Sequence, residues 1–128
     1  MSVIRAASLH PITGQGSVYW PLATPSNGAA ELIVARVAKA PGQPGSIHSH
    51  DHEEVVVALI GTATAVLDRQ ETEKTELSAG DVLIIPAGQL HQVSASGDQG
   101  FECIIAKPAG THFYDASGQV MSTPSWMA

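Results

Sequence analysis

Glycine and proline interrupt this chain so often that it suits short strands and leaves little room for long helices. The 128 residues include 12 Gly and 8 Pro, spread along the whole sequence. Many short segments punctuated in this way are typical of an all-β sandwich or barrel. The apolar and β-branched runs between the breaks predict five strands, at residues 31–38, 55–60, 62–67, 82–85 and 101–106.

No linker, repeat or low-complexity segment divides the sequence, so we expect one all-β domain over residues 1–128. Residues 68–74 are polar and predict a hairpin tip. Residues 1–29 contain Gly and Pro throughout, and we expect them to be irregular. The tail, residues 107–128, is interrupted in the same way and is expected to wrap the outside of the domain.

The charge of the chain argues against polyanionic partners. Its net charge is -6 with histidine neutral, and its 6 Lys and Arg residues are scattered along the sequence. Binding to nucleic acid or to an anionic membrane requires clustered cations. We therefore expect a small-molecule partner that is not highly anionic.

The single cysteine, Cys103, excludes an intrachain disulfide and fits a reducing compartment. It lies in an apolar strand and is expected to be a small buried hydrophobic residue. The first residues have no long apolar stretch, and no run of about 18 apolar residues occurs anywhere. We therefore expect a cytoplasmic protein with neither a signal peptide nor a membrane span.

Histidines gather in two places, His48, His50 and His52 in one segment and His91 in another. Alternate residues of a strand face the same side, so His48 and His50 can direct two imidazoles at one point, and Glu54 has the same parity. His91 follows a Pro-Ala-Gly turn and can approach from a neighbouring strand. Imidazoles with one carboxylate suit a transition metal better than calcium or magnesium. A loose histidine-rich metal trap at the surface remains the alternative.

These two segments resemble the two sequence motifs of the cupin superfamily. The first motif is G-x5-H-x-H-x3,4-E-x6-G, and its fixed positions are occupied here by Gly42, His48, His50, Glu54 and Gly61. The second is G-x5-P-x-G-x2-H-x3-N, and its matching positions are Gly80, Pro86, Gly88 and His91. Ala95 stands where the second motif ends in Asn, a residue that does not bind the metal.

The resemblance implies a double-stranded β-helix, or jelly-roll barrel, with one divalent transition metal per chain near one mouth. It implies that His48, His50, Glu54 and His91 are the ligands. Fe(II) or Mn(II) is favoured, although Ni, Zn and Cu are compatible with the same donors. It also implies a homodimer, since cupins of this size often pair or exchange edge strands.

The parity of the strands and the family positions together predict the residues of a substrate pocket. The predicted apolar lining consists of Val56, Ala58, Ile60, Leu83, Ile85 and Val93. His52 and Arg36 are further candidates, as an alternate ligand or base and as a binder of a substrate carboxylate. The alternative for both is an exposed position. The aromatic pairs Tyr19-Trp20 and Phe113-Tyr114 are expected to make core or dimer contacts.

We rank a metal-dependent dioxygenase acting on a small organic molecule first, with Glu54 able to act as a general base. A metal-dependent isomerase, lyase or polyketide-type cyclase without redox chemistry comes second. A cupin that binds a small ligand without catalysis is the third possibility. The fold alone does not choose among them, because one fold hosts many functions.

Overall fold

The structure is a computed structural model that describes residues 1–14 and 16–128. Eleven strands and three short 3-10 helices occur in these residues. The strands are β1 (Ile12–Gly14), β2 (Ser17–Ala23), β3 (Leu32–Lys39), β4 (His48–His50), β5 (Glu54–Val66), β6 (Lys74–Ser78), β7 (Val82–Ile85), β8 (Gln92–Ala95), β9 (Phe101–Pro108), β10 (Phe113–Asp115) and β11 (Val120–Met121). The 3-10 helices are η1 (Ala6–Ser8), η2 (Pro25–Asn27) and η3 (Ser125–Met127).

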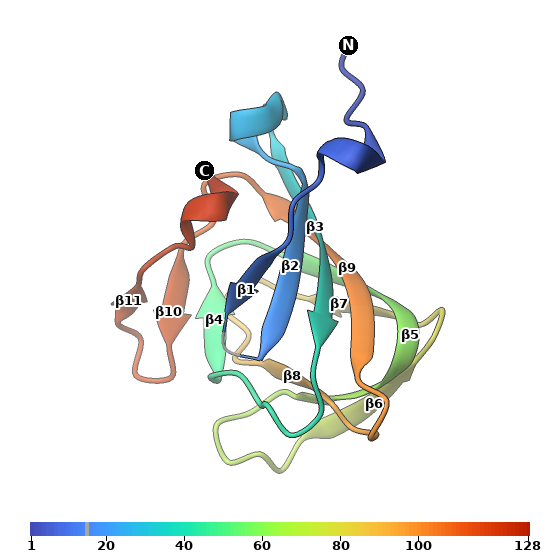
Figure 1. Cartoon of the computed structure of the whole chain (residues 1–128). Helices are drawn as coiled ribbons and strands as arrows, with labels where there is room; N and C mark the ends of the chain where they lie inside the picture. Colours follow the sequence, from blue (N-terminus) through green and yellow to red (C-terminus); the bar gives the residue numbers. More distant parts are fainter. Residues whose placement is uncertain (15) are drawn as a thin grey trace.

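Two antiparallel sheets form the jelly-roll barrel that the sequence predicted (Figure 1). The larger sheet runs in the order β1-β2-β3-β9-β5-β6, and β7 and β8 also pair with β5. The smaller sheet has the order β11-β10-β4. Strand β5 pairs with four other strands. Its first half pairs with β7 and β9, and its second half pairs with β6 and β8.

Strand β5 continues through Gly61, where the sequence pattern predicted the end of a strand. The register with β9 shifts between Ala58 and Ile60, which marks a β-bulge. Gly61 has φ 79°, and a Cβ at this position would lie 2.1 Å from the carbonyl oxygen of Gly100. Only glycine therefore fits, because both the left-handed backbone and the close approach of β9 exclude a side chain.

The expectation that residues 1–29 are irregular is wrong for β1 and β2. These strands pair with each other, and β2 also pairs with β3 along most of its length. Pro21 is accommodated because the β2–β3 register shifts between Pro21 and Ala23. A proline lacks the N–H of a regular ladder and is tolerated at such irregularities.

The core follows the period-2 alternation of the strands. In β3, Ile33, Ala35 and Val37 are buried, while the residues between them face outward. The main core cluster consists of Val37, Val56, Ala58, Ala63, Leu77, Ile85, Phe101 and Cys103. Cys103 is thus a buried hydrophobic residue, as the sequence predicted.

The tail takes part in the barrel, contrary to the expectation that it wraps the outside. Strand β10 pairs with β4 on one side and with β11 on the other. Phe113 and Met127 are buried in a second cluster with Ile33. Figure 1 shows β10, β11 and the C-terminal turn lying beside β4. The tail therefore closes the barrel next to the histidines of β4.

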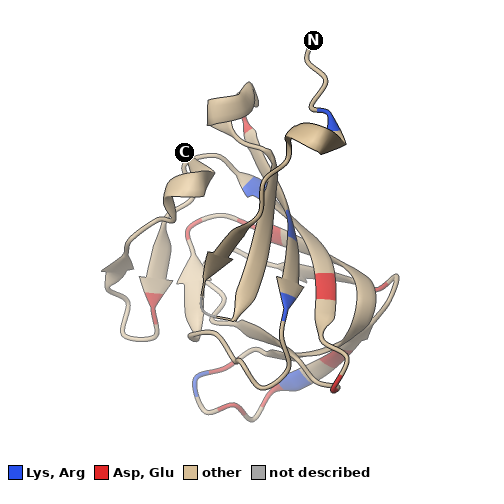
Figure 2. Ribbon diagram, viewed as in Figure 1, with Lys and Arg blue, Asp and Glu red and all other residues tan. Residues whose placement is uncertain are grey.

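The surface charges of the described chain are dispersed over the ribbon (Figure 2). Within residues 1–14 and 16–128, no helix is long and apolar enough to cross a membrane.

Candidate metal centre

Three histidines that are distant in the sequence are held together by backbone hydrogen bonds. His48 and His50 lie on β4, and His91 directly precedes β8. The His48 N–H donates to the His91 carbonyl oxygen at 3.1 Å, and the His91 N–H donates to the His48 carbonyl oxygen at 2.8 Å. The Gly88 N–H donates to the carbonyl oxygen of His50 at 2.8 Å. The turn before His91 is therefore pinned against β4, which fixes the positions of all three rings.

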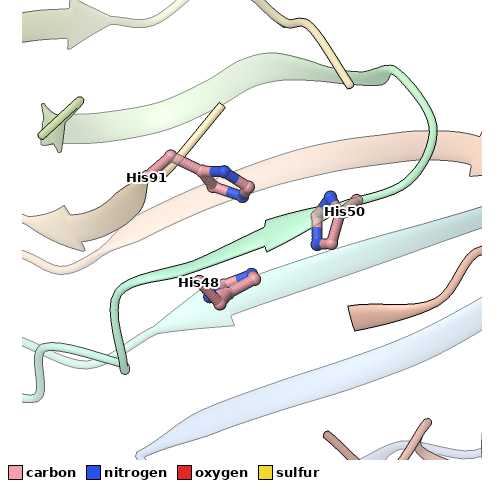
Figure 3. A group of neighbouring side chains, drawn as sticks. All are labelled: His48, His50 and His91. Atoms are coloured by element: carbon pink, nitrogen blue, oxygen red, sulfur yellow. The ribbon is translucent and has the colours of Figure 1, made fainter. Parts of the chain in front are cut away.

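The three imidazoles surround one point (Figure 3). Each ring offers a nitrogen that lies within 4.8 Å of the nitrogens of the other two. The ring centroids of His48 and His91 are 4.5 Å apart, and those of His50 and His91 are 4.8 Å apart. Phe113 packs against His50 with the ring centroids 4.5 Å apart. The cluster is thus enclosed by the tail as well as by the barrel.

Backbone carbonyls select the tautomers of two of the rings. The Nδ1 of His48 lies 2.8 Å from the carbonyl oxygen of Ser46, and the Nδ1 of His91 lies 2.9 Å from that of Gln89. A carbonyl oxygen only accepts, so each Nδ1 carries the proton and donates it. Each Nε2 then keeps a free lone pair, which is the arrangement found in histidines that bind metals.

Burial keeps the three rings uncharged. It lowers the pKa of His48 and His91 below the ordinary value, and it lowers the pKa of His50 to about 3. The positive charge of Lys107 acts in the same direction on each ring. All three imidazoles are therefore neutral near neutral pH, and only the neutral ring binds a metal.

The ring nitrogens that remain fit a divalent transition metal. Within the described residues, both ring nitrogens of His50 and the Nε2 of His91 are buried without a hydrogen-bond partner. Buried polar atoms are rarely left unpaired, because burial without a partner costs about 1–3 kcal/mol. A metal held by these nitrogens would satisfy them, and three imidazoles are borderline donors that suit such an ion.

Glu54, the fourth predicted ligand, lies beside the histidines and is held by a lysine. Its Oε2 is 3.8 Å from the Nδ1 of His50 and accepts a hydrogen bond of 2.8 Å from the Nζ of Lys107. Burial favours a higher pKa for Glu54, but Lys107 and His50 outweigh it and hold the pKa below its ordinary value. Glu54 is therefore a buried carboxylate next to the centre.

Lys107 was not among the predicted site residues, because the sequence pattern ended the last strand at Ala106. Strand β9 continues to Pro108, and Lys107 follows Phe101, Cys103 and Ile105 on the inward face. Extending the period-2 alternation by one residue would have found it.

A cavity of about 490 Å³ opens beside the histidines. His48, His91, Glu54 and Lys107 contribute to its wall. Its apolar lining includes Tyr19, Val37, Val56, Val93, Ile105, Phe113, Trp126 and Met127. Two of the predicted pocket residues, Val56 and Val93, are thus in the cavity wall.

The other predicted apolar residues lie elsewhere. Ala58 and Ile85 are buried in the main core, and Leu83 packs against it. Ile60 is 56% exposed because the bulge before it reverses the alternation, so that it pairs with the outward-facing Glu102. The sequence pattern carried no signal of that bulge.

Arg36 and His52 do not line this cavity. Arg36 faces outward from β3, where its guanidinium pairs with Glu102 and lies over the ring of Trp20. His52 is exposed, and its Nδ1 is 2.8 Å from an oxygen of Asp51. His52 is therefore exposed and Arg36 lies half-buried on the outer face, so neither takes the predicted pocket position.

Two aromatic residues expected to make core or dimer contacts pack in the core clusters and also line the cavity. Tyr19 lies on one side, with its ring centroid 5.4 Å from that of Trp126. Phe113 covers the histidines from the tail. The cavity therefore has an aromatic wall built from both ends of the chain.

Comparison with known proteins assigns the chain to a family. A sequence profile described as the cupin domain matches residues 35–106, more than half of the chain. The protein therefore belongs to the cupin superfamily, as its two motifs predicted. A search of curated proteins finds no match.

Several solved cupin structures are similar to this chain. The polyketide cyclase RemF from Streptomyces resistomycificus is 18% identical, with a TM-score of 0.75 over 87% of this chain and 81% of its own. A sugar phosphate isomerase of the cupin superfamily from Silicibacter pomeroyi is 20% identical, with a TM-score of 0.73 over 97% and 93%. KdgF from Halomonas sp. is 20% identical, with a TM-score of 0.68 over 84% and 94%. These likenesses establish the fold and leave the reaction open.

Proposed function

We propose that this cupin is a metal-dependent enzyme that acts on a small organic molecule in the 490 Å³ cavity. The observation that carries the proposal is the cluster of three neutral imidazoles, in which both ring nitrogens of His50 and the Nε2 of His91 are buried without a hydrogen-bond partner in the described chain. His48 and His91 belong to the wall of the cavity, so a molecule inside it would reach the same centre.

His48, His50 and His91 would hold one divalent transition metal per chain, with Glu54 as the additional donor beside them. Fe(II) and Mn(II) are the favoured ions. When bound, such an ion supplies Lewis-acid polarisation of the oxygens of a bound substrate.

The residues of the chain itself favour proton transfer as the chemistry. Glu54 is a carboxylate at the cavity wall, able to accept a proton from a carbon next to a polarised carbonyl and to return it at another position. Lys107 holds Glu54 in place through the 2.8 Å hydrogen bond and balances its charge. Apolar and aromatic side chains form much of the rest of the cavity wall. An isomerase, lyase or cyclase working on a carbonyl compound is therefore the first candidate.

A dioxygenase is the second candidate, and the donor set supports it. Three imidazoles with a carboxylate alongside suit Fe(II), and the apolar walls suit an aromatic or enolic substrate. The ranking from the sequence is reversed in this proposal because the Glu54–Lys107 pair provides a group for proton transfer.

Two measurements on the metal-loaded protein separate these candidates. The protein is incubated with small diketones and 2-oxo acids in D2O, and exchange of carbon-bound protons is followed by NMR. Oxygen uptake is recorded with the same compounds. Exchange that disappears in Glu54→Gln, without oxygen uptake, supports the first candidate, whereas oxygen uptake supports the second. Binding without either signal would leave a ligand-binding cupin and contradict the enzymatic proposal.

The expected homodimer stays a proposal, supported by the outer face of the large sheet. Ile60, Val82 and Ile84 are all more than half exposed there, on the adjacent strands β5 and β7. Exposed apolar patches of this kind favour association. Light scattering after gel filtration tests it, with a mass of twice 13.3 kDa as the expected result and a monomer as the contrary one.

A further inference from the structure

The cavity wall contains a second lysine for which the proposed function gives no role. Lys39 is the last residue of β3 and continues the inward face of Ile33, Ala35 and Val37. It lines the same cavity as His48, His91 and Glu54. Its charge is close enough to affect the protonation of His91, just as the charge of Glu54 affects that of Lys39.

Lys39 has no carboxylate within 4 Å in the part of the chain that the structure describes. Its neighbour Cys103 provides no counter-charge at neutral pH, because burial raises the pKa of this thiol to about 11. Its other neighbour, Glu54, is already paired with Lys107. With both lysines protonated and Glu54 ionised, this wall carries two positive charges against one negative charge.

An uncompensated ammonium at an apolar wall is unfavourable unless a partner arrives with the ligand. Burial lowers the pKa of Lys39 from its ordinary value, and the nearby Glu54 does not offset that effect. A carboxylate within hydrogen-bond distance would restore the charged form and gain a charge-assisted hydrogen bond. A metal at the three histidines would add further positive charge to the same cavity and strengthen the preference for an anion.

We propose that Lys39 binds a carboxylate of the substrate, so that the natural substrate is a small carboxylic acid with an apolar body. The body would lie against Tyr19, Phe113 and Trp126. The inference rests on the proposed function in placing the carbonyl oxygen next to that carboxylate beside the histidines. The net charge of the chain alone excluded only highly anionic partners. The position of Lys39 narrows the expected substrate to a monocarboxylate.

The test compares acids with their uncharged amides on the full chain loaded with Mn(II). The probes are phenylglyoxylate, phenylpyruvate and 4-methyl-2-oxopentanoate, each paired with its amide and titrated by calorimetry. We expect at least one acid to bind about tenfold or more tightly than its amide. Lys39→Met removes this preference, and Lys39→Arg retains most of it. Lys74→Met is the matched control, because Lys74 is exposed on β6, and it leaves the preference unchanged.

Several outcomes would overturn the inference. They are equal binding of acid and amide to the unsubstituted protein, an unchanged preference in Lys39→Met, and the absence of binding by all three acids. Trapping a covalent imine on Lys39 with cyanoborohydride would also overturn it, since Lys39 would then act as a nucleophile. Thermal unfolding of each variant verifies that it is folded.

The metal content of the same samples separates this inference from the proposed function. A Lys39-dependent preference for acids in protein without stoichiometric metal would contradict the metal-dependent enzyme and leave the carboxylate site standing. Stoichiometric metal without that preference would contradict the carboxylate site and leave the metal-dependent enzyme standing.

Discussion

The two walls of the cavity are built in different ways. The histidine wall comes from β4 and the turn before β8, and backbone hydrogen bonds between His48 and His91 lock its rings in place. The rest of the wall is assembled from the ends of β3 and β9, from β2 and from the tail, segments that strand pairing and packing bring together from distant parts of the sequence. One wall therefore holds the histidines that match the family motifs, while the other is lined by residues that lie outside those motifs. We therefore propose that the metal and the substrate are selected by separate parts of this chain.

The largest effect is expected at the histidine wall. The double variant His48→Ala with His91→Ala should lower the affinity for a divalent metal by about a thousandfold or more, because two of three imidazole donors are lost. The barrel should persist, since the main core cluster does not include these rings. Metal content and thermal unfolding measure the two effects.

His112→Ala provides the control for that experiment, because His112 is exposed and binds Asp51. It should leave metal affinity unchanged. Global unfolding of the double variant would mean that the metal wall supports the whole fold, and the two walls would then not be independent.

The two walls meet at the buried ion pair of Lys107 and Glu54. Replacing Lys107 by Met leaves a buried carboxylate without its partner, and we expect a loss of about 3–4 kcal/mol in the free energy of unfolding of the metal-free protein. Adding Glu54→Gln should recover most of this loss, because the charge is removed. Chemical denaturation measures both variants. An equal loss in the single and double variants would show that packing, and not charge, dominates at this junction.

Strand β5 contributes Glu54 and Val56 to the cavity, and Gly61 allows its close approach to β9. Gly61→Ala should cost about 3 kcal/mol, since it combines a left-handed backbone with a clash against the Gly100 carbonyl. Gly80→Ala is the matched control, because Gly80 also has a positive φ of 93° but nothing lies within 4 Å of an added Cβ. It should cost only about 1–2 kcal/mol. Equal losses would remove the role assigned to the close contact with β9.

The last predicted effect, the smallest per pH unit, is a pH dependence of the stability of the metal-free protein that arises at the histidine wall. Burial lowers the pKa of His50 from an ordinary value of 6.5 to about 3, so the unfolded chain takes up the proton first. Stability is therefore greatest above about pH 6.5 and falls as the pH drops towards 3, by at most about 1.4 kcal/mol per pH unit for this group. Denaturation between pH 7 and 5 checks the slope, and His50→Gln should flatten it. A slope that His50→Gln leaves unchanged would contradict the assignment.

The sequence predicted the histidine wall well because its signal is local. The alternation of His48 and His50, the turn before His91 and the two motifs all lie within short segments whose parity is readable. It predicted the opposite wall poorly, because Lys39 and Lys107 each lie one residue beyond the strand ends that the composition indicated. The bulge that turns Ile60 outward and the pairing of β10 with β4 depend on contacts between distant segments. Local propensity carries no information about such contacts.

Anomalous X-ray diffraction from crystals of the protein purified without added metal tests the central claim most directly. The account predicts one transition-metal ion per chain, with ring nitrogens of His48, His50 and His91 about 2.0–2.2 Å away. An ion bound elsewhere, or full-length protein whose three imidazoles surround no ion, would contradict it.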